Sequence, residues 1–96
     1  MEIKKPAVAG TLESSDCMVT VEPGQGEIVL DLDSVVIRQY GKQIRKVIHE
    51  TLERLDVTSA NVTVVDKGAL DCTIKARVKT ALHRASESDE YNWQKA

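Results

Sequence analysis

CMVTVEPGQGEIVLDLD, residues 17–33, is the stretch that decides the fold. Apolar side chains occupy every second position in residues 17–22 and again in residues 28–33, a period that is typical of half-buried strands. Between the two runs lies Pro23-Gly24-Gln25-Gly26-Glu27, a five-residue loop rich in turn formers. The stretch therefore predicts two strands that form an antiparallel hairpin.

The residues after this stretch follow a helical period. Apolar side chains recur every three or four residues from Ile37 to Leu55, with charged side chains on the other faces. This pattern predicts a long amphipathic helix capped by Asp33 or Ser34. Its basic first half suits either a solvated face or a docking site for an acidic partner. We expect His49 on the helix surface, since no nucleophile lies near it in sequence.

A third strand and a second helix complete the pattern. Residues 61–65 (NVTVV) are rich in β-branched side chains, residues 66–68 (DKG) predict a turn, and residues 69–85 have one apolar helical face. If the first helix is a crossover, the third strand lies parallel to the second, and residues 7–12 could add an edge strand. Strand order stays open. The expected class is α+β, a two-layer sandwich (β-β-α-β-α) with two amphipathic helices on one face of a small mixed sheet of three to four strands.

The chain is expected to hold a single domain in residues 1–85 and a mobile C-terminal tail in residues 86–96, because the periodicity stops there. Trp93 in this tail either anchors a partner or lies back on its own domain. A chain of 96 residues is long enough for one core but disfavours a deep substrate cleft.

Charge and hydropathy limit the partners. Thirteen basic side chains are scattered among fifteen acidic ones, for a net charge of −2. This pattern lacks the basic patch that would bind the phosphate backbone of a nucleic acid. No apolar run approaches the roughly 20 residues that a membrane helix requires, and the first residues lack the apolar segment of a signal peptide. We therefore expect a soluble, cytoplasmic protein with no nucleic-acid or membrane partner.

The cysteines and histidines are weak candidates for a metal site. Cys17 and Cys72 both lie in apolar patterns, which predicts two buried thiols. Together with His49 and His83 they contain no pair at the short spacing that zinc ligands use. No metal ligand is predicted.

The segment GTLESSD, residues 10–16, sets two adjacent hydroxyls between carboxylates and is the candidate site. No nucleophile elbow, Ser-x-x-Lys pair or suitably placed histidine accompanies Ser14 and Ser15, so no catalytic residue is predicted. An acceptor for a covalent group needs only an accessible hydroxyl on a yielding backbone, and this segment offers one. The alternative is a polar turn that is stabilised by side-chain to backbone hydrogen bonds.

The run PAVAGTLESSD (residues 6–16), together with DKGALD (residues 66–71) and Ala76-Arg77, resembles the acyl carrier proteins of citrate lyase, the gamma chain. Length and order of elements match as well, so the resemblance covers nearly the whole chain. The first motif is specific, whereas a turn before a helix explains much of the second. The common phosphopantetheine carriers differ, since they resemble a helical bundle with the attachment serine in an Asp-Ser-Leu motif.

The resemblance implies an acyl carrier domain in residues 1–85 that catalyses nothing itself. It maps a phosphoribosyl-dephospho-coenzyme A prosthetic group, attached through a phosphodiester, onto Ser14, with Ser15 as the rival; the chain would then be a phosphoprotein. Acetyl and citryl groups would be held as thioesters while citrate is cleaved to acetate and oxaloacetate in citrate fermentation. The implied partners are the alpha (transferase) and beta (lyase) chains, the prosthetic-group transferase and an acetate ligase. The competing class is an unmodified interaction domain that docks through its basic helix and Trp93.

Four carboxylates lie in or near these motifs. Glu13 and Asp16 either are recognised by the enzyme that attaches the group or keep the turn solvated. Asp66 and Asp71 are interpreted as turn and helix-start residues rather than as ligands.

Overall fold

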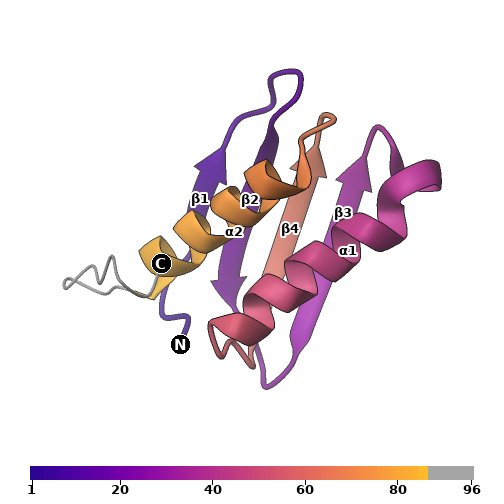
Figure 1. The fold of residues 1–96 in the computed structure, drawn as a ribbon. Coiled ribbons are helices and arrows are strands. Elements are labelled where there is room, and N and C mark those ends of the chain that lie inside the picture. Colours follow the sequence, from indigo (N-terminus) through magenta and orange to yellow (C-terminus); the bar gives the residue numbers. More distant parts are fainter. Residues whose placement is uncertain (87–96) are drawn as a thin grey trace.

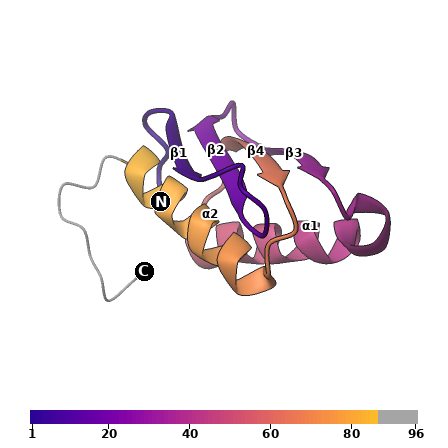
Figure 2. The ribbon, with the colours of Figure 1, turned by 90° about the horizontal axis from the view of Figure 1, so that it is seen from above.

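The computed structural model describes residues 1–86 and has the predicted two layers, a four-stranded sheet with both helices on one face (Figure 1 and Figure 2). The elements, in chain order, are β1 (Ala7–Gly10), β2 (Cys17–Pro23), β3 (Ile28–Ser34), α1 (Ile37–Arg54), β4 (Ala60–Asp66) and α2 (Asp71–Ala85). The α+β class and the N-terminal edge strand are confirmed. No helix in this part of the chain is long and apolar enough to cross a membrane. The predicted role of Trp93 concerns residues 87–96, which lie outside the described part.

The strand order β1-β2-β4-β3 shows that the predicted hairpin of β2 with β3 is wrong. β4 lies between them, antiparallel to β2 and parallel to β3, so the predicted parallel pair is confirmed. The glycine-rich loop after β2 passes around the start of β4. There Gly26 N donates to Ser59 Oγ (2.8 Å), and Ala60 N donates to Glu27 O (3.1 Å). Gly24 lies so close to the Ala60 backbone that a β-carbon would not fit.

The distribution of charge explains why β4, rather than β3, is central. The inward-facing side chains of β4 are at most 1% exposed, and its outward positions include the uncharged Asn61 and Thr63. The outward face of β3 carries Asp31 and Asp33, which are exposed. Charged side chains are common on edge strands, where they hinder pairing with a further strand. The crossover helix α1 then returns the chain beside β3, which separates β3 from β2.

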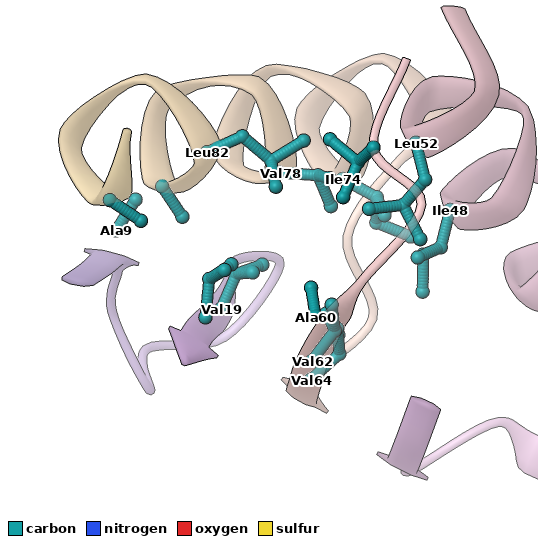
Figure 3. Packing of buried hydrophobic residues seen from close by; sticks show 14 of the residues in the cluster. Ala9, Val19, Ile48, Leu52, Ala60, Val62, Val64, Ile74, Val78 and Leu82 are labelled. Atoms are coloured by element: carbon teal, nitrogen blue, oxygen red, sulfur yellow. The ribbon is translucent and has the colours of Figure 1, made fainter. Parts of the chain in front are cut away.

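The core lies between the sheet and the two helices and is aliphatic (Figure 3). The helices bury their apolar faces at the predicted spacing of three and four residues. The largest buried side chains are Ile48, Leu52, Ile74, Leu82, Val19, Val21, Val62, Val64 and Val78. Burial of one such side chain contributes roughly 1.5–3 kcal/mol, so this layer is the main source of stability.

The start of α1 differs from the prediction. The helix begins at Ile37 after Val36, rather than at a cap formed by Asp33 or Ser34. Ser34 ends β3 instead, and its buried Oγ donates to Asp66 Oδ2 (2.8 Å). Ser34 Oγ also accepts a hydrogen bond from Val36 N (3.1 Å), but the helix starts only after Val36 and no side chain caps its first turn, so the cap prediction is wrong.

Several predicted core positions are exposed. Cys17 is buried as predicted, but Cys72 is exposed in the first turn of α2. Tyr40 and Leu70, which fit the apolar helical faces, are 56% and 71% exposed. Both belong to the start of a helix, where strands β3 and β4 stop. His49 is exposed on α1, as predicted.

One end of the molecule gathers the connections that matter for the site. The β1–β2 loop (residues 11–16), the β3–α1 connection (residues 35–36) and the β4–α2 turn (residues 67–70) lie there with the starts of both helices (Figure 1). We call this region the loop end. The candidate serines are therefore presented away from the N-terminal segment, which lies at the other end, where Lys4 N donates to Ala85 O (2.9 Å).

Candidate functional site

Ser14 lies at the tip of a tight turn in the β1–β2 loop. Asp16 N donates to Glu13 O (3.2 Å), which closes a β-turn with Ser14 and Ser15 as its central residues. Ser15 has a φ of 65°, and a positive φ at this third position is typical of a type II turn. Both serines are exposed, so both hydroxyls are accessible to another protein.

Backbone pairing to Lys67 anchors this turn to the sheet. Ser15 N donates to Lys67 O (2.9 Å), and Lys67 N donates to Asp16 O (2.9 Å). Ser15 and Asp16 thus lie opposite the single residue Lys67, immediately beyond the paired Cys17 and Asp66. This is the arrangement of a β-bulge whose first residue has a left-handed backbone. Such bulges redirect side chains. The left-handed backbone falls on Ser15, and Ser14 stays at the outer corner of the turn.

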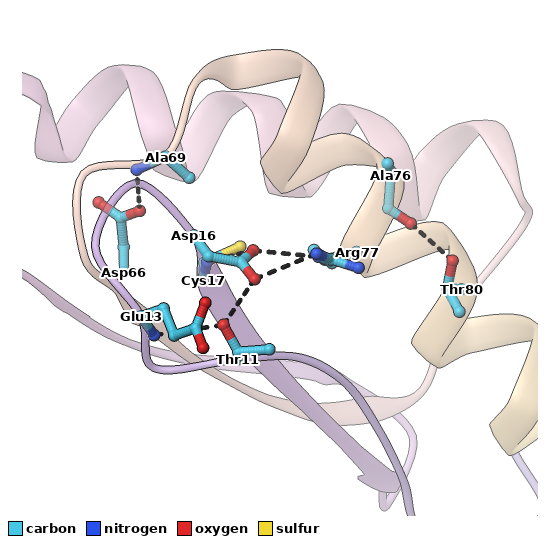
Figure 4. Close-up of polar contacts among 9 residues, drawn as sticks. All are labelled: Thr11, Glu13, Asp16, Cys17, Asp66, Ala69, Ala76, Arg77 and Thr80. Carbon is cyan, nitrogen blue, oxygen red and sulfur yellow. Dashed lines mark hydrogen bonds and ion pairs between the residues drawn. The ribbon is translucent and has the colours of Figure 1, made fainter.

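The Asp16 carboxylate ties the loop to α2 (Figure 4). It accepts hydrogen bonds from Arg77 Nε (3.0 Å) and Nη2 (3.1 Å) and from Thr11 Oγ1 (2.7 Å). It also accepts one from Cys17 N (2.8 Å). The bonds from Arg77, then Thr11 and the Cys17 amide, lower the pKa of Asp16 to about 2. Asp16 therefore holds the loop in place rather than merely keeping the turn solvated, and its recognition by an attaching enzyme stays a prediction.

Thr11 connects the two halves of the loop. Its hydroxyl donates to Asp16 and accepts a hydrogen bond from Glu13 N (3.2 Å). The Glu13 residue is exposed, so its recognition by an attaching enzyme stays a prediction. The network shows that the backbone of this segment is held on both sides of the serines, whereas the sequence predicts a yielding one.

The loop leaves β1 at a position that suits glycine alone. Gly10 has a φ of +92°, and a β-carbon there would overlap the Cys17 carbonyl oxygen. It would also approach Arg77 Cδ (3.2 Å). The close approach of β1 and β2 at the base of the loop therefore depends on the missing side chain.

Two further carboxylates order the β4–α2 turn. Asp66 is 1% exposed, and its Oδ1 accepts a hydrogen bond from Ala69 N (2.9 Å). Asp71 opens α2 and accepts one from Gln43 Nε2 (3.0 Å) on α1. The predicted roles of Asp66 and Asp71 in the turn and at the helix start are confirmed. This turn contains Lys67, the residue that pairs with the serine loop.

The histidines lie on the helices, away from the tip of the serine loop. His49 is in α1, and His83 is in the last turn of α2, about 18 Å along the axis from the start of that helix. Burial, and then the charge of Lys79, lower the pKa of His83. Within residues 1–86, no three His, Cys, Asp or Glu side chains are grouped so that they could hold a metal ion. The geometry suits a hydroxyl that is presented to another enzyme.

Sequence reasoning identified Ser14 and Ser15 but not the residues whose side chain or backbone holds their loop. Arg77 is 61 positions from Asp16, and Lys67 comes from another turn. In the sequence, Lys67 and Arg77 are marked only because both lie in motifs that resemble those of the citrate lyase carriers.

The chain is similar to carrier proteins over nearly its full length. Residues 4–85 match the family model described as ACP, malonate decarboxylase delta subunit (MdcD). Citrate lyase acyl carrier proteins from Streptococcus mutans serotype c and Streptococcus equi subsp. equi are 59% and 58% identical, over 98% of this chain and 93% of theirs. The protein of the same name from Streptococcus uberis is 55% identical with the same coverage.

A solved structure shares the fold. It is a chain in the crystal structure of a Pseudomonas malonate decarboxylase hetero-tetramer in complex with malonate, with a TM-score of 0.72 and 18% identity. The match covers 88% of this chain and 92% of that chain. At this identity the likeness concerns the fold alone, whereas the sequence relatives confirm the predicted family. The chain belongs to the citrate lyase acyl carrier proteins, within the family described as the malonate decarboxylase delta subunit (MdcD).

Proposed function

We propose that this chain is the acyl carrier subunit of a citrate lyase complex and that Ser14 is the attachment point of its prosthetic group. The names of its relatives and its family model support the carrier role. One observation carries the assignment of the serine: Ser14 is exposed at the outer corner of a turn that is tied down on both sides.

The residues at the loop end fit a phosphoribosyl-dephospho-coenzyme A group attached through a phosphodiester. Such a group adds negative charge beside Glu13 and Asp16, which would repel it. The Asp16 carboxylate, however, is paired with Arg77, so the local charge is less negative than the sequence suggests. When bound, the group would supply a thiol that holds acetyl or citryl as a thioester. Ser14 would contribute its hydroxyl, and the attaching enzyme would contribute the catalysis.

Ser14 is favoured over Ser15 by the backbone. The Ser15 amide is bonded to Lys67, and its left-handed φ belongs to the bulge. Within residues 1–86, no hydrogen bond ties Ser14 to the rest of the domain. An enzyme that must draw a hydroxyl into its active site can therefore take Ser14 without opening the pairing of the loop with β4.

We extend the proposal to the partners. The chain would serve an alpha (transferase) chain and a beta (lyase) chain, would receive its group from a prosthetic-group transferase, and would be acetylated by an acetate ligase. It would act in the cytoplasm, in line with the free thiols of Cys17 and Cys72. It would have no catalytic residue of its own, because each chemical step would take place in a partner chain while the tether keeps the acyl group close.

Intact-mass measurement of the protein from cells that use citrate tests this proposal. We expect a mass one prosthetic group above that of the bare chain, mapped to Ser14 by fragmentation and abolished by Ser14→Ala. Ser15→Gly is the matched control, because it removes the rival hydroxyl while glycine accepts the positive φ. A bare wild-type mass would overturn the carrier proposal in favour of an unmodified interaction domain. Added mass that disappears only in Ser15→Gly would overturn the choice of Ser14.

A further inference from the structure

Exposed apolar side chains gather at the loop end. Within residues 1–86, seven large apolar side chains are exposed, and five of them come from the connections and helix starts at this end: Leu12, Val35, Ile37, Tyr40 and Leu70. We call these five residues the apolar rim. Single exposed apolar side chains are ordinary, but a cluster of them marks a contact surface. Leu12 belongs to the loop that presents the candidate serine, Leu70 to the turn paired with that loop, and the other three to the β3–α1 side of the same end.

Printed contacts bring the parts of the rim together. Leu70 closes the turn whose Lys67 pairs with the serine loop. Val35 N donates to Asp66 O (3.2 Å), which joins the start of the β3–α1 connection to the same turn. The bond from Gln43 to Asp71 then ties the first turns of α1, and Tyr40 with them, to the start of α2. The rim residues from three connections thus flank one turn.

Charge beside the α1 part of the rim is positive. Helix α1 carries five basic and two acidic side chains, although the whole chain has a net charge of −2. Arg38 and Lys42 are exposed in its first half, next to Ile37 and Tyr40. Lys46, farther along, is already paired with Glu50 (3.9 Å). A partner that covers the rim would therefore gain from carboxylates placed opposite Arg38 and Lys42.

We propose that the apolar rim and the basic start of α1 form a docking surface for an enzyme chain that takes the acyl thioester from this carrier. The patch of that chain would be apolar, bordered by carboxylates, and placed at the mouth of its active site. The inference rests on the proposed function, because a contact surface at the end that presents Ser14 serves a partner only if the group attached there must enter that partner. Apolar contacts near the centre would supply affinity, and the charges would orient the approach.

Two pairs of variants separate the rim from the rest of the surface. Tyr40→Gln with Leu70→Gln makes the rim polar. Val8→Thr with Val29→Thr is the matched control, because these residues are 46% and 48% exposed on the sheet face that no helix covers. All four side chains are at least 46% exposed, so both double variants should fold.

A second comparison tests the charge. Arg38→Glu with Lys42→Glu reverses two charges beside the rim. Lys4→Glu with Lys5→Glu makes the same change in net charge at the opposite end, beside Ala85. If long-range charge alone attracted the partner, both variants would weaken binding to the same degree.

The assay is binding of each modified variant to the purified transferase and lyase chains, after intact mass has confirmed the group on Ser14. We expect the rim variant to lose about tenfold or more in affinity for at least one chain. The charge variant at α1 should lose more than the Lys4 and Lys5 variant, by a factor that shrinks at high salt. The Val8 and Val29 control pair should bind like the wild type.

The outcomes separate this inference from the proposed function. Absence of the added mass in the wild type would remove the proposed function itself. Normal modification with unchanged binding of the rim variants to both enzyme chains would overturn the docking surface. Loss of modification in the rim variants alone, with their unmodified forms binding both enzyme chains as the unmodified wild type does, would replace the assigned occupant with the attaching enzyme. Concentration-dependent self-association of the wild type, abolished in the rim variant, would replace it with a second copy of this chain.

Discussion

Replacing Gly10 with alanine should destabilise the base of the serine loop, and two other glycines supply the comparison. Gly10, Gly26 and Gly68 have φ values of +92°, +91° and +93°. A left-handed backbone costs an L-residue about 1–2 kcal/mol, of which about 0.4–1 kcal/mol is offset by the lower entropy of the unfolded alanine variant. A β-carbon at Gly26 or Gly68 meets nothing within 4 Å. We therefore expect those two variants to lose about 1 kcal/mol in free energy of unfolding.

Gly10→Ala has a steric cost as well. Its β-carbon would overlap the Cys17 carbonyl group, which belongs to the backbone of β2 and is flanked by the paired strands. Relief requires β1 to move away from β2, and overpacking of this kind costs about 1–3 kcal/mol. The total loss is then about 2–4 kcal/mol, which is a large part of the roughly 5–14 kcal/mol expected for a domain of this size.

Urea unfolding followed by far-ultraviolet circular dichroism measures the difference. With a slope of about 1 kcal/mol per molar urea, the midpoint of Gly10→Ala should fall by about 2–4 M, and those of Gly26→Ala and Gly68→Ala by about 1 M. The Gly68 variant controls for a change near the site, and the Gly26 variant for a change at the opposite end. Equal shifts in all three variants would refute the steric argument, because only the backbone cost is shared.

Two further predictions concern titratable groups. The pKa of Asp16 is about 2 in the folded protein against an ordinary value of 3.8, so its bond to Arg77 should stabilise the fold above about pH 4 and lose this effect as the pH falls toward 2. The difference in free energy of unfolding between the wild type and Asp16→Asn should shrink over that range, and a constant difference would contradict the bond. In unmodified Ser14→Ala protein at pH 8, a thiol reagent should label Cys72 quickly and Cys17 only after unfolding. Burial, and then nearby carboxylates, raise the pKa of Cys17 to about 11, so about one Cys17 in a thousand is a thiolate at pH 8. Fast labelling of both cysteines in the folded protein would contradict this prediction.

The elements of the fold could be predicted from local pattern, but their order in the sheet could not. Alternation in residues 17–33 correctly indicates two strands and a reversal between them. A reversal of chain direction fits two strands that pair directly as a hairpin, and it fits equally well two antiparallel strands with a third strand between them. The decision depends on β4, which offers a fully buried inner face, and on Asp31 and Asp33, which suit an edge. Comparing β3 with β4 requires two strands that are separated in the chain by α1, so no local pattern makes the choice.

The candidate site shows the same division between local and distant signals. The serines are recognisable because two hydroxyls between carboxylates are an unusual local sequence. Their supports are not, since Asp16 is bonded to Arg77 in α2 and the loop is paired to Lys67 after β4. An exposed charge in a turn normally contributes little, which favours a solvating role for Asp16 until its partner is seen.

The held backbone changes where motion must come from in a carrier. A tether raises the local concentration of its cargo at a partner site only if some part of the linkage is flexible. The bonds of Asp16 and Lys67 fasten the loop at the base, so little freedom is left to the protein segment itself. The flexibility must then lie in the group attached to Ser14. A fixed attachment point has an advantage, because a docked partner always finds the attached end of that group in the same position. A rigid anchor beside the apolar rim is therefore consistent with docking first and transfer second.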